Sequence, residues 1–241
     1  MYRSRNQLVI LDLDGTLVDS FHAVELAFER HGMDIGDLRR FQRRRKLLKY
    51  VGGLREFPKN LRKQLSKEHR KQIKHTLTEI YRNEAHVFPA MASLLQALIE
   101  APDIRVGVVS RNVTVDPEET VRQVLRRNGI DCDGMDFLEC IPLGGDKTNQ
   151  FRTLRERFGI NPSRAYACGD EYHDYAAAIS SGMVPFVVSY GFEDHERLVS
   201  NYGIPEEVIS RSPRELMDRV CHTLDLESPG LLVRPRPVSG E

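Results

Sequence analysis

The 241-residue sequence contains no tryptophan, and aromatic residues make up only 7% of it. It has no apolar run of about 18 residues, the length that a membrane-spanning helix requires, and its N-terminus lacks the apolar stretch of a signal peptide. Its four cysteines have no C-x-x-C spacing, which argues against a zinc ribbon or a disulfide framework and suits a reducing cytosol. We therefore expect a cytoplasmic protein without a membrane partner.

Net charge is also absent, because 35 Lys and Arg residues balance 35 Asp and Glu residues. The balance conceals a segregation, since residues 39–74 include 15 basic and only 2 acidic residues, a local charge of +13. Such segregation is typical of two structural units. The basic stretch leaves open an anion- or nucleic-acid-binding function. Nucleic acid is a disfavoured partner, however, because the stretch has few aromatic side chains on which bases could stack, namely Phe41, Tyr50 and Phe57.

Strand and helix patterns alternate along most of the chain. The apolar run 8–13 predicts a buried strand, and later apolar runs predict strands at 104–110, 137–142, 164–168 and 184–189. The helical segments between them include one that begins at Asp116-Pro117, an acidic N-cap followed by a proline in the first turn. Strands and helices in alternation predict a parallel sheet that is covered on both faces.

Residues 18–86 differ from the remainder because they show only helical patterns, at 20–31, 37–50 and 60–82. We therefore predict an α/β fold, a three-layer Rossmann-like parallel-sheet core with an inserted all-helical cap. The predicted units are a core at 1–17 and 87–225, a cap at 18–86, and a loose Pro- and Gly-rich C-terminal tail at 226–241.

Polar side chains follow the predicted strands, at the edge of a parallel sheet where ligands bind. They are Asp12 and Asp14 after the first strand, Ser110 after the second, Lys147 beyond the third, and Asp170 and Asp174 after the fourth. Because Asp12 and Asp14 are two residues apart on an extended segment, we expect them to point to the same side. Their repulsion predicts a positive group between them or a proton on one of them. The whole set predicts a site for a cation and an anion together.

Four short motifs, taken together and in this order, resemble those of the haloacid dehalogenase superfamily. They are "DLDGT" at 12–16, "VVSRN" at 108–112, the lysine of "GGDKTNQF" (Lys147) and "GDEYHD" at 169–174. The resemblance covers residues 7–222 and is to those phosphatases whose helical cap is inserted after the first strand. The stretch "GDEYHDYAAAISSGM", the "YGF" at 190–192 and the position of the cap are similar to phosphoglycolate phosphatases.

This resemblance implies a role for each matched residue. Asp12 would be the nucleophile that forms an aspartyl-phosphate, Asp14 the general acid and base, and Lys147 the cation that neutralises developing charge. The residues implied to bind phosphate are Thr16, Ser110, Arg111 and Asn112, and those implied to bind Mg²⁺ are Asp12, Asp14, Asp170 and Asp174. The cap loop "YVGGLREFPK" corresponds in position to the substrate-specificity loop of the family. There Arg55, together with Lys49, would bind the far end of the substrate.

The function that follows is a magnesium-dependent phosphatase that hydrolyses a small phosphorylated metabolite through an aspartyl-phosphate. A phosphomutase shares every catalytic residue, so the sequence leaves it open. A dehalogenase is disfavoured, because that chemistry needs no second aspartate as acid and base, and Asp14 is present. The third alternative, an anion- or nucleic-acid-binding protein that uses the basic cap, is disfavoured by the complete catalytic set.

Overall fold

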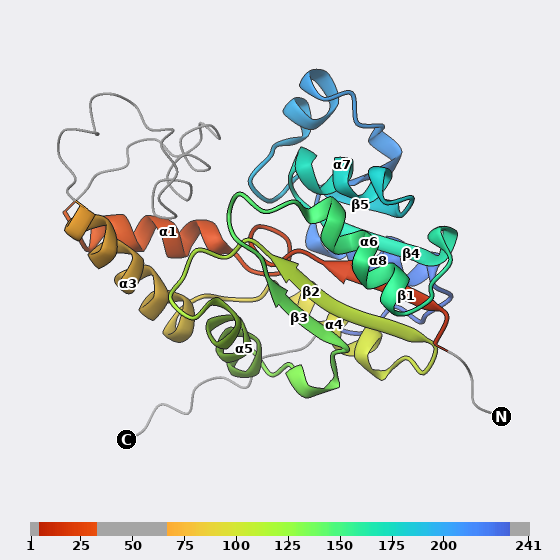
Figure 1. Ribbon diagram of the computed structural model, residues 1–241, viewed down its shortest axis with the longest axis horizontal. Coiled ribbons are helices and arrows are strands. Elements are labelled where there is room, and N and C mark those ends of the chain that lie inside the picture. The colour runs from red at the N-terminus through yellow and green to blue at the C-terminus, as the bar shows by residue number, and fades with distance from the viewer. Residues whose placement is uncertain (1–4, 33–66, 232–241) are drawn as a thin grey trace.

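The computed structural model describes residues 5–32 and 67–231, which form an α/β fold around one parallel sheet (Figure 1). The six strands lie in the order β3-β2-β1-β4-β5-β6, and each neighbouring pair is parallel. Five of them were predicted, and the short edge strand β6 was not. The strands are β1 (Gln7–Leu11), β2 (Ile104–Ser110), β3 (Phe137–Cys140), β4 (Ala165–Gly169), β5 (Val184–Val188) and β6 (Ile209–Ser210).

Helices cover both faces of this sheet. Helices α4 and α8 pack against each other on one face, and α6 and α7 pack together on the other, while α5 packs against β3 (Figure 1). The helices are α1 (Ser20–Glu29), α3 (Lys67–Asn83), α4 (Pro89–Glu100), α5 (Pro117–Arg127), α6 (Lys147–Arg157), α7 (Tyr172–Ser180) and α8 (Pro213–Thr223). Short helical turns occur at Cys132–Gly134, Pro162–Arg164, Arg197–Asn201 and Glu206–Val208.

The apolar run of β1 accounts for both helical layers, because successive side chains of a strand point to opposite faces. Val9 and Leu11 are buried in a cluster that includes side chains of α4 and α8. Leu8 and Ile10 are buried in a second cluster, with side chains of α6 and α7. A strand that is buried on both faces has a continuous apolar sequence, as this one does. The predicted three-layer, Rossmann-like arrangement is therefore confirmed.

Helices α1 and α3, which belong to the predicted cap, lie side by side beyond the carboxyl ends of β1 and β2 (Figure 1). Their buried side chains, such as Phe28 of α1 and Leu77 of α3, join the same apolar cluster as Val9 and Leu11 of the sheet. Helix α3 also packs against α5. These two helices therefore lie directly on the core, close to the polar edge of the sheet.

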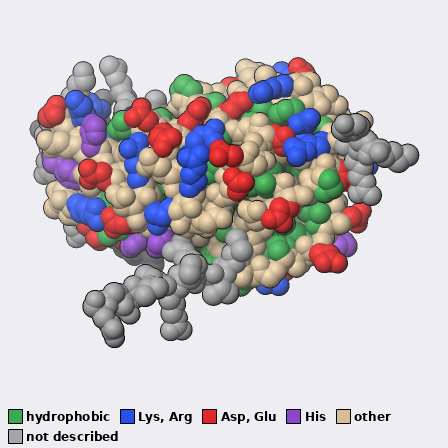
Figure 2. All heavy atoms as spheres, turned by 90° about the horizontal axis from the view of Figure 1, so that it is seen from below, with side chains coloured by type: hydrophobic (Ala, Val, Ile, Leu, Met, Phe, Trp, Pro, Cys, Tyr) green, Lys and Arg blue, Asp and Glu red, His purple; other side chains and the backbone are tan. Residues whose placement is uncertain are grey.

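The boundaries of the cap and of the C-terminal tail stay predictions, because residues 33–66 and 232–241 lie outside the described residues. Arg55, Lys49 and most of the basic stretch fall in the first of these gaps. On the face shown in Figure 2, acidic and basic side chains are interspersed over the described residues. No helix in the described part of the chain has the length and hydropathy needed to cross a membrane.

Candidate active site

The loop after β1 brings the first motif to the carboxyl edge of the sheet. The N–H of Asp12 donates to the carbonyl oxygen of Cys168 at 2.9 Å, which extends the pairing of β1 with β4 by one residue. Gly15 then adopts a φ of +80°, and a Cβ atom there would lie 2.3 Å from a carboxylate oxygen of Asp170. Only glycine combines this backbone conformation with so close an approach. The glycine of the motif therefore allows the loop to pass directly beside Asp170.

A buried lysine links two of the predicted carboxylates. Lys147, the first residue of α6, is only 3% exposed, and its Nζ lies 2.8 Å from Asp12 Oδ2 and 2.5 Å from Asp174 Oδ1. Burial lowers the pKa of Lys147, but the two carboxylates raise it by more, so the net pKa is above its usual value. Burial raises the pKa of Asp12 to about 7, while Lys147 acts in the opposite direction. Lys147 is therefore a fixed cation beside the predicted nucleophile.

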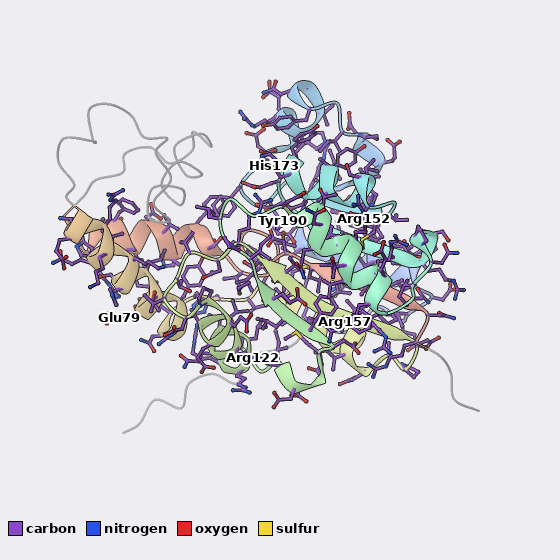
Figure 3. All side chains as sticks on the ribbon, in the orientation of Figure 1. Glu79, Arg122, Arg152, Arg157, His173 and Tyr190 are labelled. Atoms are coloured by element: carbon purple, nitrogen blue, oxygen red, sulfur yellow. The ribbon has the colours of Figure 1, made fainter. Side chains whose placement is uncertain are left out.

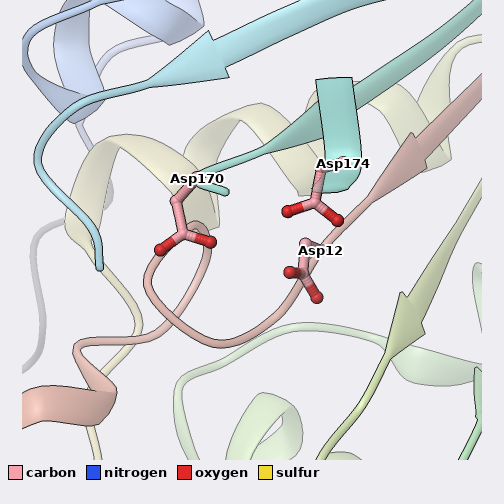
Figure 4. A group of neighbouring side chains, drawn as sticks. All are labelled: Asp12, Asp170 and Asp174. Carbon is pink, nitrogen blue, oxygen red and sulfur yellow. The ribbon is translucent and has the colours of Figure 1, made fainter. Parts of the chain in front are cut away.

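Three carboxylates, those of Asp12, Asp170 and Asp174, lie within 4.8 Å of one another (Figure 4). Asp170 is fully buried, and its Oδ2 accepts the N–H of Phe192 at 2.5 Å. Its Oδ1 is buried without a hydrogen-bond partner among the described residues. Burial, followed by the charges of neighbouring carboxylates, raises the pKa of Asp170 well above its usual range. The site thus has three carboxylates and one lysine, and Asp170 Oδ1 has no hydrogen-bond donor among the described residues. This excess of negative charge fits a small divalent cation such as Mg²⁺, which prefers hard oxygen ligands.

Asp14 has different surroundings, because its hydrogen-bond partners are neutral. Tyr81 Oη donates to its Oδ1 at 2.5 Å. Its Oδ2 accepts from Asn112 Nδ2 at 3.2 Å and from Ser110 Oγ at 3.3 Å. Burial raises the pKa of Asp14, while the hydrogen bonds from these three side chains, together with the charge of Lys147, act in the opposite direction. Asp14 is therefore the carboxyl group of the motif that is surrounded by dipoles instead of by a cation.

The structure brings most of the predicted site residues to one edge of the sheet. Ser110 and Asn112, which the resemblance assigns to phosphate, hold the carboxylate of Asp14 in this structure. Thr16 is fully buried, with its carbonyl oxygen accepting from Tyr190 Oη at 3.0 Å, and its hydroxyl has no partner among the described residues. Their proposed roles toward a phosphate group stay predictions. Asp174 both contacts Lys147 and accepts the N–H of Glu171 at the start of α7.

A cavity of about 360 Å³ opens beside Lys147. Its lining includes Arg111, which is half-buried, together with His173 from the first turn of α7 (Figure 3) and the glycines before α6, Gly144 and Gly145. The charge of Arg111 lowers the pKa of Lys147, so the two cations lie close enough to repel each other. The cavity therefore adjoins the lysine that contacts the predicted nucleophile, and its lining combines the cation of Arg111 with the exposed carboxylate of Asp146.

Sequence patterns did not single out two residues that support the site. Tyr81 lies in α3, and its sequence context marks it only as a buried position on a helix. Glu193 is fully buried and accepts the N–H of Tyr172, which fixes the start of α7 near Asp174. Neither residue belongs to a motif, so neither has a signal that is readable from one sequence. Their contacts come from chain segments far apart in the sequence.

Comparison with known proteins agrees with this geometry. The sequence model of the haloacid dehalogenase-like hydrolases matches residues 7–182. A curated relative, a phosphoglycolate phosphatase from Vibrio vulnificus, is 26% identical over 247 residues, covering 94% of this chain and 98% of the relative. The fold resembles a haloacid dehalogenase-like hydrolase from Streptococcus pneumoniae, with a TM-score of 0.61, 19% identity, and 90% and 99% of the two chains covered. The fold also resembles a candidate β-phosphoglucomutase from Thermotoga maritima, with a TM-score of 0.60 and 16% identity. The match covers 90% of this chain and 99% of the other.

The two solved structures share less than 25% identity with this chain, so they establish its fold alone. The family is established by the sequence model. The matched residues 7–182 make up most of the chain and include all four motifs, from Asp12 to Asp174. The chain therefore belongs to the haloacid dehalogenase-like hydrolases, as its motifs predicted.

Proposed function

We propose that this protein is a magnesium-dependent phosphatase that hydrolyses a small phosphorylated metabolite through an aspartyl-phosphate on Asp12. The observation that carries the proposal is the contrast between two carboxyl groups of one loop. Asp12 is paired with Lys147 at 2.8 Å, whereas among the described residues the groups that donate hydrogen bonds to Asp14 are neutral. A nucleophile must be ionised and a general acid must hold a proton, and these two environments support that division of roles.

In the first half-reaction, a carboxylate oxygen of Asp12 attacks phosphorus, and the bond from phosphorus to the leaving oxygen breaks. Asp14 gives its proton to that leaving oxygen. Lys147 balances charge on Asp12 and on the phosphate, and Asp174 holds Lys147 in place through its 2.5 Å contact. Bound Mg²⁺, held by Asp12, Asp170 and the carbonyl oxygen of Asp14, with Asp174 nearby, would supply the charge neutralisation that lets an anion attack a phosphate dianion.

In the second half-reaction, Asp14 is a carboxylate and acts as a base. It takes a proton from a water molecule, whose oxygen attacks the phosphorus of the aspartyl-phosphate. The bond between phosphorus and the oxygen of Asp12 breaks, and inorganic phosphate leaves. The candidates for holding the phosphate oxygens during both steps are Thr16, Ser110 and Asn112.

The proposed substrate is a small phosphate monoester with a second anionic group. The relative from Vibrio vulnificus is named a phosphoglycolate phosphatase, and 2-phosphoglycolate carries both a phosphate and a carboxylate. Arg111, in the wall of the cavity beside Lys147, is a candidate cation for the second anionic group of the substrate. Arg55 and Lys49 stay predictions for the contact to the second group, because they lie outside the described residues.

A phosphomutase remains a second candidate, because it would use the same residues and because the fold resembles a candidate β-phosphoglucomutase. Release of free phosphate separates the two. The experiment incubates the full chain with a panel of phosphate monoesters that includes 2-phosphoglycolate, with Mg²⁺ or with EDTA, and measures inorganic phosphate. We expect phosphate release with Mg²⁺ and none after chelation. Full activity in EDTA would contradict the metal requirement, and isomerisation of a sugar phosphate without phosphate release would favour the mutase.

A further inference from the structure

The general acid of the proposed reaction has a partner from a distant part of the chain. Tyr81 lies in α3, 67 positions from Asp14, and its side chain is 1% exposed. Its hydroxyl lies 2.5 Å from Asp14 Oδ1, the shortest of the three side-chain hydrogen bonds to this carboxyl group. A buried phenol hydroxyl has to be hydrogen-bonded, and here its partner is the one carboxyl group that the reaction requires to change protonation.

The three donors divide between the two oxygens of Asp14. Ser110 and Asn112 both donate to Oδ2, and Tyr81 is the one donor to Oδ1 within residues 5–32 and 67–231. Ser110 and Asn112 are also candidate phosphate ligands, so a bound phosphate would compete for their donors. Tyr81 contacts the other oxygen and does not compete in this way. When a bound phosphate takes the donors of Ser110 and Asn112, and Oδ1 still accepts the hydrogen bond of Tyr81, a proton on Asp14 resides on Oδ2.

We infer that Tyr81 is a positioning residue that fixes the carboxyl group of Asp14 so that Oδ2 delivers the proton to the leaving oxygen. The inference rests on the proposed function. In this step the bond from phosphorus to the leaving oxygen breaks, the electron pair stays on that oxygen, and the Oδ2 proton of Asp14 neutralises it. Without the hydrogen bond to Oδ1, the carboxyl group can rotate, and the proton can reside on the oxygen that faces away from the substrate.

The inference predicts a dependence on the leaving group. Tyr81→Phe removes one oxygen and keeps the ring that packs in the core, so the fold is retained. An alkyl phosphate needs a proton on its leaving oxygen, whereas p-nitrophenolate is a stable anion and leaves without one. Asp14 also acts as the base of the second half-reaction, which all substrates share, so the first half-reaction is measured alone, by rapid quench of a single turnover. We expect its rate to fall about 10–100-fold for the best alkyl phosphate of the panel and less than about 3-fold for p-nitrophenyl phosphate.

Two further variants separate positioning from a structural effect. Tyr166→Phe is the matched control, because Tyr166 is a buried tyrosine of β4 that stacks on Phe186, away from Asp14. It should leave both rates unchanged. In an Asp14→Asn background, Tyr81→Phe should cause no further loss, because both changes remove the same function.

Each outcome decides the inference. A selective loss in the rate of the first half-reaction on the alkyl phosphate, together with no further loss in the double variant, supports it. Equal losses on both substrates, no loss on either, or losses that multiply in the double variant would overturn it while leaving the phosphatase assignment intact. If the unsubstituted protein releases phosphate from neither ester, the proposed function fails, and the inference fails with it.

Discussion

The two halves of the candidate active site place a carboxyl group in different surroundings, a cation in one half and neutral hydrogen-bond donors in the other. On one side, Asp12 lies against Lys147, which is itself held by Asp174. On the other side, Asp14 lies among the hydroxyl groups of Tyr81 and Ser110 and the amide of Asn112. Burial raises the pKa of both aspartates, so desolvation alone does not distinguish them. One motif can therefore supply two chemical roles when, among the described residues, a single one of its aspartates has a cation in direct contact.

Removing the carboxylate that contacts Lys147 should reduce activity more than any other change. Asp12→Asn removes the proposed nucleophile and one proposed metal ligand, so we expect kcat to fall on the order of 10⁴-fold or more. The loss should be the same for alkyl and aryl phosphates, because both require the nucleophile. Phosphate release under saturating substrate measures it.

The control for this variant is Asp131→Asn. Asp131 is exposed and caps the helical turn Cys132–Gly134 by accepting the N–H of Asp133, and asparagine serves equally well as such a cap. The control should keep its activity. A rate for Asp12→Asn within 10-fold of the unsubstituted protein would contradict the assignment of the nucleophile.

Replacing Asp14 should reduce the rate less than replacing Asp12 does, and mainly for substrates with a poor leaving group. Asp14→Asn keeps the size of the side chain but cannot give up a proton, so kcat for an alkyl phosphate should fall ~10²–10⁴-fold, the range for general acid–base catalysis. The first half-reaction on p-nitrophenyl phosphate should be affected less, because its leaving group needs no proton. Rapid-quench measurement of p-nitrophenolate release tests this. An equal loss of this first step on both substrates would remove the distinction between the two aspartates.

Much of this arrangement was predictable because it is local in the sequence. The apolar run 8–13 indicated a parallel sheet, which is present. The polar residues at strand ends were predicted to form a site at its carboxyl edge, and the structure brings Asp12, Lys147 and Asp174 into contact there. The edge strand β6 was not predicted, because two residues carry no recognisable alternation. Asp116 was expected to cap α5 with its side chain, but it adopts a φ of 46° and makes no capping hydrogen bond.

The partners of Asp14 were the least predictable part of the site. The sequence indicated that repulsion between Asp12 and Asp14 needs a positive group or a proton, but not which aspartate would contact the cation. That outcome depends on two helices that are far apart in the sequence, because α3 supplies Tyr81 to Asp14 and α6 supplies Lys147 to Asp12. Tyr81 appears in the sequence only as an apolar position of a helix, so its hydroxyl gave no indication of a contact with Asp14. Long-range packing, which no spacing encodes, decides this contact.

A third prediction concerns pH and metal. Burial raises the pKa of Asp12 from 3.8 to about 7, so in the metal-free protein the protonated form is favoured by folding. This stabilising contribution is complete below a pH of about 4 and is lost as the pH rises through about 7. Metal-free protein should therefore melt at a lower temperature at pH 8 than at pH 6. Added Mg²⁺ favours the ionised carboxylates, so it should raise Tm more at pH 8 than at pH 6.

At a Mg²⁺ concentration about 100 times its dissociation constant, the expected stabilisation is about 2.7 kcal/mol. Thermal melting with and without Mg²⁺ at the two pH values measures the difference. The control is Asp170→Asn, which removes one carboxylate of the cluster and should abolish the Mg²⁺-induced shift. A shift that is independent of pH, or that survives Asp170→Asn, would show that the ion binds elsewhere.

The fourth prediction tests whether Arg111, in addition to Lys147, contributes positive charge to substrate binding. Arg111 lines the cavity beside Lys147 and is half-buried, so solvent screens its charge in part. Arg111→Ala should raise KM about 5–10-fold for a substrate with a distal carboxylate, such as 2-phosphoglycolate, with little change in kcat. For p-nitrophenyl phosphate, KM should change less than about 2-fold, because that ester has no second anion to bind. Arg122→Ala, a half-buried arginine of α5, is the matched control and should change neither value. If Arg111→Ala raises KM equally for both esters, the guanidinium acts on the transferred phosphate itself. Lys147 and Arg111 would then both act on the transferred phosphate, and the second anionic group would be bound elsewhere.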